Sequence, residues 1–232
     1  MVFFCCQGGA CKGLEDAGWD VVRAIDIDPQ PSYYRPEVFE QGDAVDPRNF
    51  WRLMSVHLPR LVWGSPPCQR RTKAQKIQKR EHPALIAPFR ALVTEWAAMT
   101  GGAYVIENVE HGTDQPDDDP LIDPMLLCGT MFPGLRTRRH REFESNVPLA
   151  PPSPHIPMRE HPPQVKMGRP VREGDWYQAV GNFNGGDGYV KRNMGVPWMT
   201  RDGIRECIPP VYAEHVGAQV RTALTTRALL GA

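Results

Sequence analysis

The sequence predicts an α/β protein in which a Rossmann-like sheet carries helices on both faces and a small, loop-rich lobe is attached. From residue 2 to about 144, short apolar runs alternate with amphipathic stretches, which is the pattern of successive βαβ units. Prolines then cluster at 148–163, and a turn-rich stretch follows at 182–188; neither favours a regular core element. A chain of 232 residues is long enough for one full core and a small appendage.

The apolar runs and the stretches between them define the expected elements. Buried strands are predicted at 2–6, 21–25, 61–64, 104–106 and 126–131. Helices are predicted at 10–18, 47–57 and 83–99. A last helix is expected over 209–231, where proline stands at the start and apolar residues recur at helical spacing. We therefore expect a main domain at 1–144, a lobe at 145–193 and a C-terminal segment at 194–232 that packs back on the main domain.

Composition narrows the class of protein. The 27 basic residues balance the 27 acidic ones, so any binding of nucleic acid must come from local patches rather than from net charge. No apolar stretch approaches the roughly 20 residues that span a bilayer, and we expect a soluble protein without a membrane partner. The six cysteines show no C-x-x-C spacing and no secretory leader precedes them, which indicates reduced thiols in a cytosol-like compartment. No metal site is predicted.

Several polar or glycine residues follow the predicted strands. Gly8 and Gly9 join the first strand to the first helix, Asp26 ends the second strand, and Asp43 follows a third short run. Ligands of open α/β sheets bind beyond the carboxyl ends of the strands, where glycines permit close approach and a carboxylate can accept from ribose hydroxyls. Each residue taken alone is equally compatible with an ordinary turn or a solvated strand end.

A second group of residues suits covalent chemistry. Cys68 follows Pro66-Pro67 at the end of an apolar run, where a thiolate could attack an electron-poor carbon; the alternative is a buried structural thiol. Glu107 ends the next apolar run, and burial there should raise its pKa so that it can donate a proton. Arg139 and Arg141 alternate with His140, so in a strand both guanidinium groups would point to one face. The alternative for the arginines is a solvated basic edge.

Taken together, these residues resemble the DNA cytosine-5 methyltransferases. The resemblance is carried in family order by Pro66-Pro67-Cys68-Gln69, Glu107-Asn108-Val109, Arg139-x-Arg141 and a terminal Ile208 to Gly217, with the glycine turn in support. The chain is most similar to a compact member of phage or restriction-modification type. The resemblance implies a methyltransferase sheet at 1–144, a target-recognition lobe at 145–193, and a cytoplasmic monomer in a bacterial or phage-infected cell.

The resemblance also implies the reaction and the roles of the residues. S-adenosylmethionine would be the cofactor and double-stranded DNA the partner. Cys68 would add to C6 of a flipped-out cytosine, Glu107 would act at N3, Arg141 would contact O2, and Arg139 would buttress Glu107. The implied cofactor-binding residues are Phe4, Gly8, Gly9, Asp26, Ile27, Asp43, Ala44 and Pro66.

DNA contacts are expected from two basic regions. Six cations stand between residues 70 and 80, directly after Cys68, and they would bind phosphates with a steep salt dependence. In the lobe, Asn, Lys and Arg side chains could read base edges or phosphates. The expected DNA-binding residues are Gln69, Arg70, Arg71, Lys73, Lys76, Asn182, Asn184, Lys191 and Arg192.

Other functions remain open at this stage. Cys6 and Glu206 differ from the family pattern, which points to the cofactor pocket as the place where this chain departs from its relatives, including a derivative of S-adenosylmethionine as cofactor. Alkylation of a free pyrimidine nucleotide, as in thymidylate synthase, would also use a Pro-Cys nucleophile. RNA could be the substrate in place of DNA. A non-catalytic DNA-binding protein would not need Cys68 and Glu107 together with both arginines.

Overall fold

The computed structural model describes residues 1–67, 83–111, 119–157, 160, 164–165, 170–178 and 186–231. Its centre is a seven-stranded sheet in the order β3-β2-β1-β4-β5-β7-β6. The strands are β1 Val2–Phe3, β2 Ala24–Asp26, β3 Phe39–Gln41, β4 Leu61–Gly64, β5 Ala103–Val109, β6 Met125–Leu127 and β7 Arg141–Ser145. β1 to β5 pair in parallel, whereas β7 is antiparallel to both β5 and β6. The predicted Rossmann-like α/β class is confirmed.

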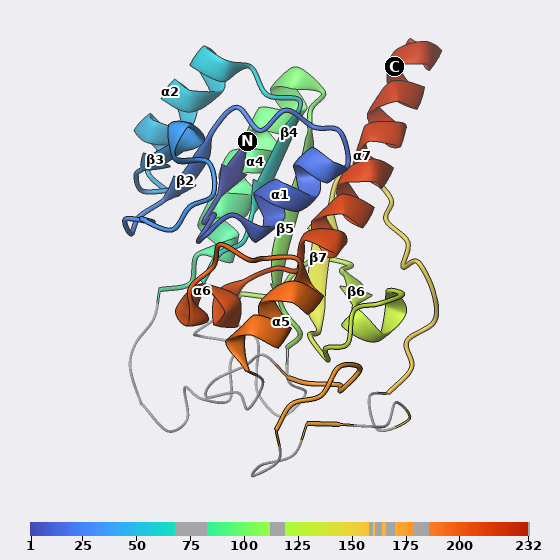
Figure 1. Ribbon diagram of the computed structural model, residues 1–232. Helices are drawn as coiled ribbons and strands as arrows, with labels where there is room; N and C mark the ends of the chain where they lie inside the picture. The colour runs from blue at the N-terminus through green and yellow to red at the C-terminus, as the bar shows by residue number, and fades with distance from the viewer. Residues whose placement is uncertain are drawn as a thin grey trace.

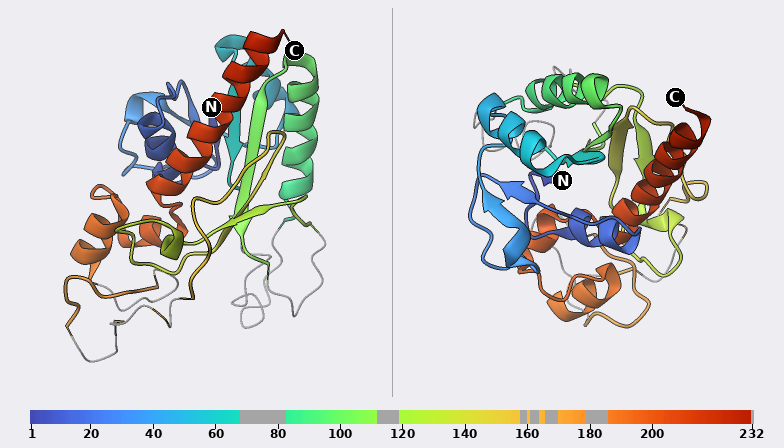
Figure 2. Two further views of the ribbon diagram at one scale, coloured as in Figure 1. Left: turned by 90° about the vertical axis from the view of Figure 1, so that its right-hand side faces the viewer. Right: turned by 90° about the horizontal axis from the view of Figure 1, so that it is seen from above.

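Helices cover both faces of the sheet (Figures 1 and 2). On one face α1, Gly9–Asp16, and α7, Pro210–Leu230, pack together. On the other face lie α2, Pro47–His57, and α4, Ile86–Thr100. Each face has its own apolar core, because the central strands are buried on both sides: Val2 and Trp63 belong to one core, Phe3 and Val62 to the other. This arrangement is expected for parallel strands, which alternate their side chains between two covered faces.

Glycines allow α1 and α7 to approach closely. A Cβ atom added to Gly13 would lie 1.9 Å from the Pro210 carbonyl oxygen, and one added to Gly217 would lie 2.8 Å from a Leu14 methyl carbon. Trp19 Nε1 donates to the Gly217 carbonyl at 2.9 Å. The close contact brings the start of α7 next to the turn between β1 and α1.

Shorter and more polar elements differ from the sequence-based expectation. β1 ends at Phe3 rather than at residue 6, because Phe4 and Cys6 adopt φ angles of 54° and 45°. The expected strand at 126–131 divides into β6 and a 3-10 turn, η3 Gly129–Met131. The elements that were not predicted are η1 Pro36–Val38, β3, β7, α5 Asp187–Met194 and α6 Arg201–Glu206. α5 lies in the stretch that the sequence indicated to be loop-dominated; its apolar residues Tyr189, Val190 and Met194 are buried.

Within the described part of the chain, none of the helices combines the length and apolar character needed to cross a membrane.

Candidate active site

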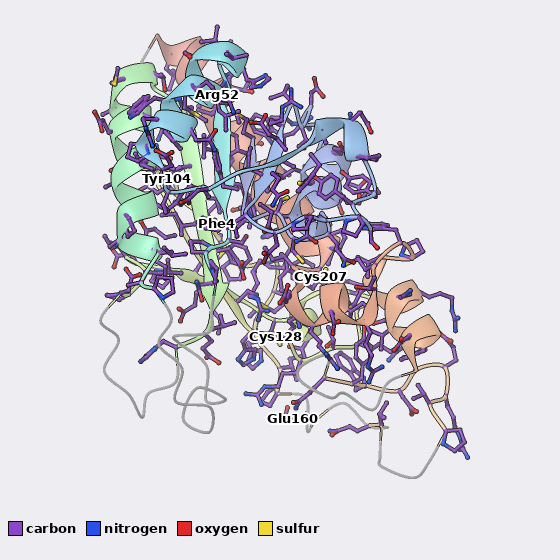
Figure 3. The ribbon with its side chains drawn as sticks, turned by 90° about the vertical axis from the view of Figure 1, so that its left-hand side faces the viewer. Phe4, Arg52, Tyr104, Cys128, Glu160 and Cys207 are labelled. Carbon is purple, nitrogen blue, oxygen red and sulfur yellow. The ribbon has the colours of Figure 1, made fainter. Side chains whose placement is uncertain are left out.

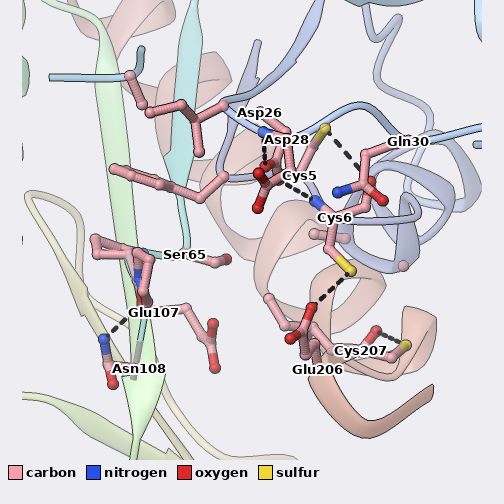
Figure 4. Close-up of a pocket in the computed structure, with 18 of the residues that line it drawn as sticks. Cys5, Cys6, Asp26, Asp28, Gln30, Ser65, Glu107, Asn108, Glu206 and Cys207 are labelled. Carbon is pink, nitrogen blue, oxygen red and sulfur yellow. Dashed lines mark hydrogen bonds between the residues drawn. The ribbon is translucent and has the colours of Figure 1, made fainter. Parts of the chain in front are cut away.

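A cavity of about 340 Å³ opens at the carboxyl edge of the parallel strands (Figure 4). Segments distant in the sequence enclose it: the turn after β1, the ends of β2, β4 and β5, and the segment around α6. Figure 3 shows Phe4, from the turn after β1, and Cys207, from the segment between α6 and α7, at this edge. The lining includes every expected cofactor-binding residue except Gly8, together with Glu107 and Arg141.

The turn between β1 and α1 is held by the carboxylate that ends β2. The Cys6 amide donates to Asp26 Oδ2 at 2.8 Å, and the Asp28 amide donates to Asp26 Oδ1 at 3.1 Å. Burial raises the pKa of Asp26, and these amide bonds oppose the rise. Each carboxylate oxygen has two lone pairs, so both Asp26 oxygens retain capacity to accept from a ligand in the cavity.

The two glycines of this turn have different roles. Gly9 lines the cavity at the start of α1, and a Cβ atom there would lie 2.4 Å from the Ile208 carbonyl oxygen. Gly8 has a φ of 90°, and a Cβ atom on it would lie 2.8 Å from the Tyr34 ring. Gly8 therefore shapes the turn and packs beneath tyrosine rings; it does not line the cavity, and its expected contact with the cofactor stays a prediction.

At the other end of the cavity, Glu107 and Arg141 form a buried ion pair. Arg141 Nε lies 2.8 Å from Glu107 Oε1, and the two residues are only 7% and 4% exposed. The register of β5 and β7 pairs Glu107 with Phe143 and Val109 with Arg141, so the carboxylate and the guanidinium are diagonal neighbours on one face. Arg141 Nη1 also donates to the His140 carbonyl at 2.8 Å.

Arg139 lies before β7 begins, and its surroundings differ from those of Arg141. It is 1% exposed and donates from Nε to the Cys207 carbonyl at 2.6 Å and from Nη2 to the Arg205 carbonyl at 2.7 Å. Burial lowers the pKa of its guanidinium to about 10. β7 starts only at Arg141, so the strand geometry that would place both guanidinium groups on one face does not extend to Arg139. It is Arg141, expected to contact the base, that pairs with Glu107.

The Pro66-Pro67 segment, which precedes Cys68, is attached to β5. Asn108 Nδ2 donates to the Pro66 carbonyl at 2.9 Å (Figure 4), and Pro66 and Pro67 both line the cavity. Asn108, which follows Glu107 in the Glu-Asn-Val motif, thus fixes the direction in which the chain leaves β4. The predicted site residues that lie outside the described residues are Cys68, Gln69, Arg70, Arg71, Lys73, Lys76, Asn182 and Asn184.

Lys191 and Arg192 lie on α5 and do not line this cavity. Arg192 Nη2 is 3.8 Å from Glu173 Oε2, and both side chains are largely exposed. Figure 1 shows α5 and α6 at the end of the molecule where the parallel strands have their carboxyl ends. Helix α5, which carries Lys191 and Arg192, is therefore at the same end of the molecule as the cavity, but neither residue lines the cavity.

Several lining residues were not among the predicted site residues. Cys6 Sγ lies 3.4 Å from Glu206 Oε2 (Figure 4), and burial raises the pKa of the Cys6 thiol well above its ordinary value. The sequence carried a signal for this pair, since both residues depart from the resembled motifs. It carried none for the others that chain folding brings in, which include Met199, Arg205 and Leu85.

The strand order defines a Rossmann-like α/β fold, and comparison with solved structures agrees. DNMT2 from Spodoptera frugiperda, solved as a mutant, superposes with a TM-score of 0.58 at 13% identity over 95% of this chain and 98% of that chain. EhMeth, a methyltransferase from Entamoeba histolytica, gives 0.57 at 10% identity over 96% and 97%.

A DNA modification methyltransferase encoded within an E. coli prophage matches with a TM-score of 0.44 at 21% identity, over 62% of this chain and 44% of that chain. No protein-family model matches the sequence, and no curated protein sequence matches it. The likeness to the DNMT2 and EhMeth structures establishes the fold.

Proposed function

We propose that this protein is an S-adenosylmethionine-dependent methyltransferase that acts on C5 of cytosine in DNA. The observation that carries the proposal is the composition of one cavity, which is lined by the strand-end carboxylates Asp26 and Asp43 and by a buried Glu107–Arg141 pair. Pro66 and Pro67, directly before the predicted nucleophile Cys68, line the same cavity. The fold, shared with methyltransferases of known structure, supports the same reading.

The residues at the first end suit S-adenosylmethionine. Phe4 and Ile27 present apolar surface, and Ile27 is 61% exposed although it is a large aliphatic residue. Asp26 can accept from ribose hydroxyls, and Asp43 can accept from an adenine amino group. Glu206 adds a carboxylate that suits the positive charge of the sulfonium or amino group. When bound, the cofactor would supply the methyl group that C5 of the base accepts.

The residues at the second end suit activation of a cytosine. The Cys68 thiolate would add to C6, and Glu107 would hold a proton at N3, so that the electron density of the ring moves to C5. After C5 is methylated, loss of the C5 proton and departure of the Cys68 thiolate restore the ring. Arg141 would turn one of its donors to the base O2 while it keeps Glu107 in place. A base in a duplex must be flipped out to reach these groups.

Three substrates and one covalent trap test the proposal. We expect the full chain to transfer labelled methyl groups to duplex DNA, and not to tRNA or dCMP, and to form a covalent complex with DNA that carries 5-fluorocytosine. Cys68→Ala should abolish both signals. Glu107→Gln should reduce methyl transfer at least a hundredfold, because a general acid contributes that much or more to the rate. The control is Glu95→Gln, at an exposed position of α4, which should leave methyl transfer unchanged.

Each other outcome selects a different function. Transfer to tRNA alone would replace DNA by RNA as substrate, and transfer to dCMP alone would favour the nucleotide-alkylating alternative. DNA binding without methyl transfer, and without any effect of Cys68→Ala, would overturn the enzymatic proposal in favour of a binding protein.

A further inference from the structure

A cluster of two histidines and one cysteine lies next in sequence and space to Arg141 of the candidate active site. Cys128 follows β6, His140 precedes β7, and His155 stands in the proline-rich stretch after β7. One sulfur or nitrogen atom from each of them lies within 4.8 Å of the others. The spacing matches no sequence motif for metal binding, so only the fold brings the three together. Figure 3 places Cys128 at the same end of the sheet as Cys207, below Phe4 in that view.

The two imidazoles face each other through equivalent atoms. His140 Nε2 lies 3.1 Å from His155 Nε2, and His140 Nδ1 lies 2.5 Å from Glu110 Oε2. A carboxylate at Nδ1 fixes a proton there and directs the Nε2 lone pair outward, which is the usual support of a histidine that binds a metal. Two Nε2 atoms that converge in this way need either one shared proton or a cation between them.

The thiol completes the set. Cys128 is fully buried, and its Sγ atom lies within 4.8 Å of a ring nitrogen of each histidine. Sulfur and imidazole ligands select zinc and its neighbours rather than magnesium or calcium, which prefer oxygen. Among the described residues, the carboxylate that contacts this cluster is that of Glu110, which bonds to His140 Nδ1 and is not one of the three converging atoms. The sulfur and imidazole set therefore favours zinc.

We propose that Cys128, His140 and His155 bind one Zn²⁺ ion, with Glu110 orienting His140. In a tetrahedral site with Zn–N of about 2.0–2.1 Å and Zn–S of about 2.3 Å, the nitrogens are roughly 3.3 Å apart and the sulfur roughly 3.6 Å from each. The observed distance of 3.1 Å between the two Nε2 atoms is close to the first value, whereas the widest separation within the cluster, up to 4.8 Å, would have to shorten when the ion binds. Three protein ligands leave the fourth position to water.

The ion would join three separate segments at a point next to Glu107 and Arg141. His140 stands between Arg139 and Arg141, and its carbonyl accepts from Arg141 Nη1 at 2.8 Å. Fixing the His140 ring therefore also fixes the peptide that holds Arg141, whose Nε pairs with Glu107. The metal site itself does not depend on the proposed reaction, because its evidence is the geometry of the three ligands.

Cobalt titration tests the site directly. The full chain, with any affinity tag removed, is stripped of metal by dialysis against a chelator and titrated with Co²⁺ alone. We expect one equivalent to bind, with the thiolate-to-cobalt charge-transfer band and the strong visible bands of tetrahedral Co²⁺, and Zn²⁺ should displace it. Cys128→Ser should lose the charge-transfer band. His155→Ala should weaken Co²⁺ binding at least tenfold, and Glu110→Gln about tenfold or more.

His57→Ala, which removes a histidine from the end of α2, is the matched control and should bind Co²⁺ as the unaltered chain does. Thermal unfolding of each variant shows whether it is folded; if Cys128→Ser is not, His155→Ala and Glu110→Gln decide. The proposal is overturned if no charge-transfer band forms, if the band persists in folded Cys128→Ser, or if His155→Ala binds Co²⁺ as tightly as the unaltered chain.

Discussion

Buried charges at the candidate site are stabilised in two ways. Glu107 and Arg141 neutralise each other across two strands, whereas Arg139 donates to backbone carbonyls at the start of the C-terminal segment. A buried charge is costly unless it is paired and hydrogen-bonded, so these residues hold distant parts of the chain in one arrangement. The Tyr212 hydroxyl, which donates to the Arg139 carbonyl at 2.8 Å, adds to the same attachment.

The ion pair predicts a non-additive effect on stability. Arg141→Met removes one partner and leaves the Glu107 carboxylate buried without its guanidinium, which should cost about 3–5 kcal/mol. The double variant Arg141→Met with Glu107→Gln should lose less stability than Arg141→Met alone, because neither charge of the pair then stays buried. Urea unfolding of the two single variants and the double variant measures the coupling. Additive losses would show that the pair is not coupled in the folded protein.

Burial of Asp26 should lower the stability of the folded protein at neutral pH, although the same carboxylate is expected to bind the ligand. Its folded-state pKa is raised above the unfolded value by burial, so the contribution of Asp26 to stability falls as the pH rises through the raised pKa. Asp26→Asn removes this dependence. The stability of Asp26→Asn relative to the unaltered protein should therefore be more favourable at pH 7 than at pH 4, as measured by urea unfolding.

The same variant should bind S-adenosylmethionine at least tenfold more weakly at pH 7 in calorimetry, because one carboxylate oxygen is replaced by an amide donor. A relative stability that does not change with pH would contradict the burial argument. Unchanged ligand affinity would remove Asp26 from the proposed cofactor site.

At the scale of elements, long apolar strands and amphipathic helices follow from local sequence, and short polar ones do not. β4 lies where the sequence predicts it, since its residues are buried on both faces. β3 and β7 are not visible in the sequence, because Glu40 and Glu142 interrupt their apolar character and pairing with neighbouring strands determines them. α6 has only six residues, and its N-cap Thr200 and the Gln7 side chain that bonds to it become neighbours only in the fold.

The candidate site divides in the same manner. Asp26, Asp43 and Glu107 could be predicted because the carboxyl ends of parallel strands meet at one edge of a sheet. Glu206 and Met199 reach the cavity because Arg139 and α7 attach the C-terminal segment to the sheet. Contacts over such sequence distances leave no local pattern, and the Cys128–His140–His155 cluster was missed for the same reason.

The close contact between α1 and α7 predicts that alanine is tolerated poorly at Gly13, in contrast to a control glycine on α5. Gly13→Ala would place a methyl group against the Pro210 carbonyl oxygen, and should destabilise the protein by about 3 kcal/mol through overpacking. Gly188→Ala, at an exposed position of α5, meets only the end of Arg192 at 3.5 Å, and should be neutral or stabilising by up to about 1 kcal/mol. Thermal unfolding compares the two. Equal effects would show that the helices separate without cost.

At the scale of the whole molecule, charge is balanced while the expected nucleic-acid contacts are concentrated. The formal net charge is zero, so the molecule as a whole does not attract a polyanion. The candidate cavity itself carries acidic residues, since Asp26, Asp28, Asp43 and Glu206 are among those that line it. A DNA-binding protein with this distribution would depend on a local cluster of cations, and the sequence has one between residues 70 and 80.

That dependence predicts how salt affects DNA binding. Each phosphate neutralised by a cation contributes about −0.9 to the slope of log K against log salt, so replacing the six cations at 70–80 by glutamine should remove up to about five units of slope. The change should weaken binding to all duplex sequences alike, since phosphate contacts carry no sequence information. Fluorescence anisotropy with labelled duplexes over a series of salt concentrations measures the slope.

The control removes cations elsewhere on the molecule. Glutamine replaces Arg23, Arg48 and Arg52, which lie on or near β2 and α2, away from the cavity. This variant leaves the 70–80 segment intact, and its slope of log K against log salt should equal that of the unaltered protein. If the two sets of substitutions lower the slope equally, the segment has no special part in DNA binding and only the general charge of the molecule matters.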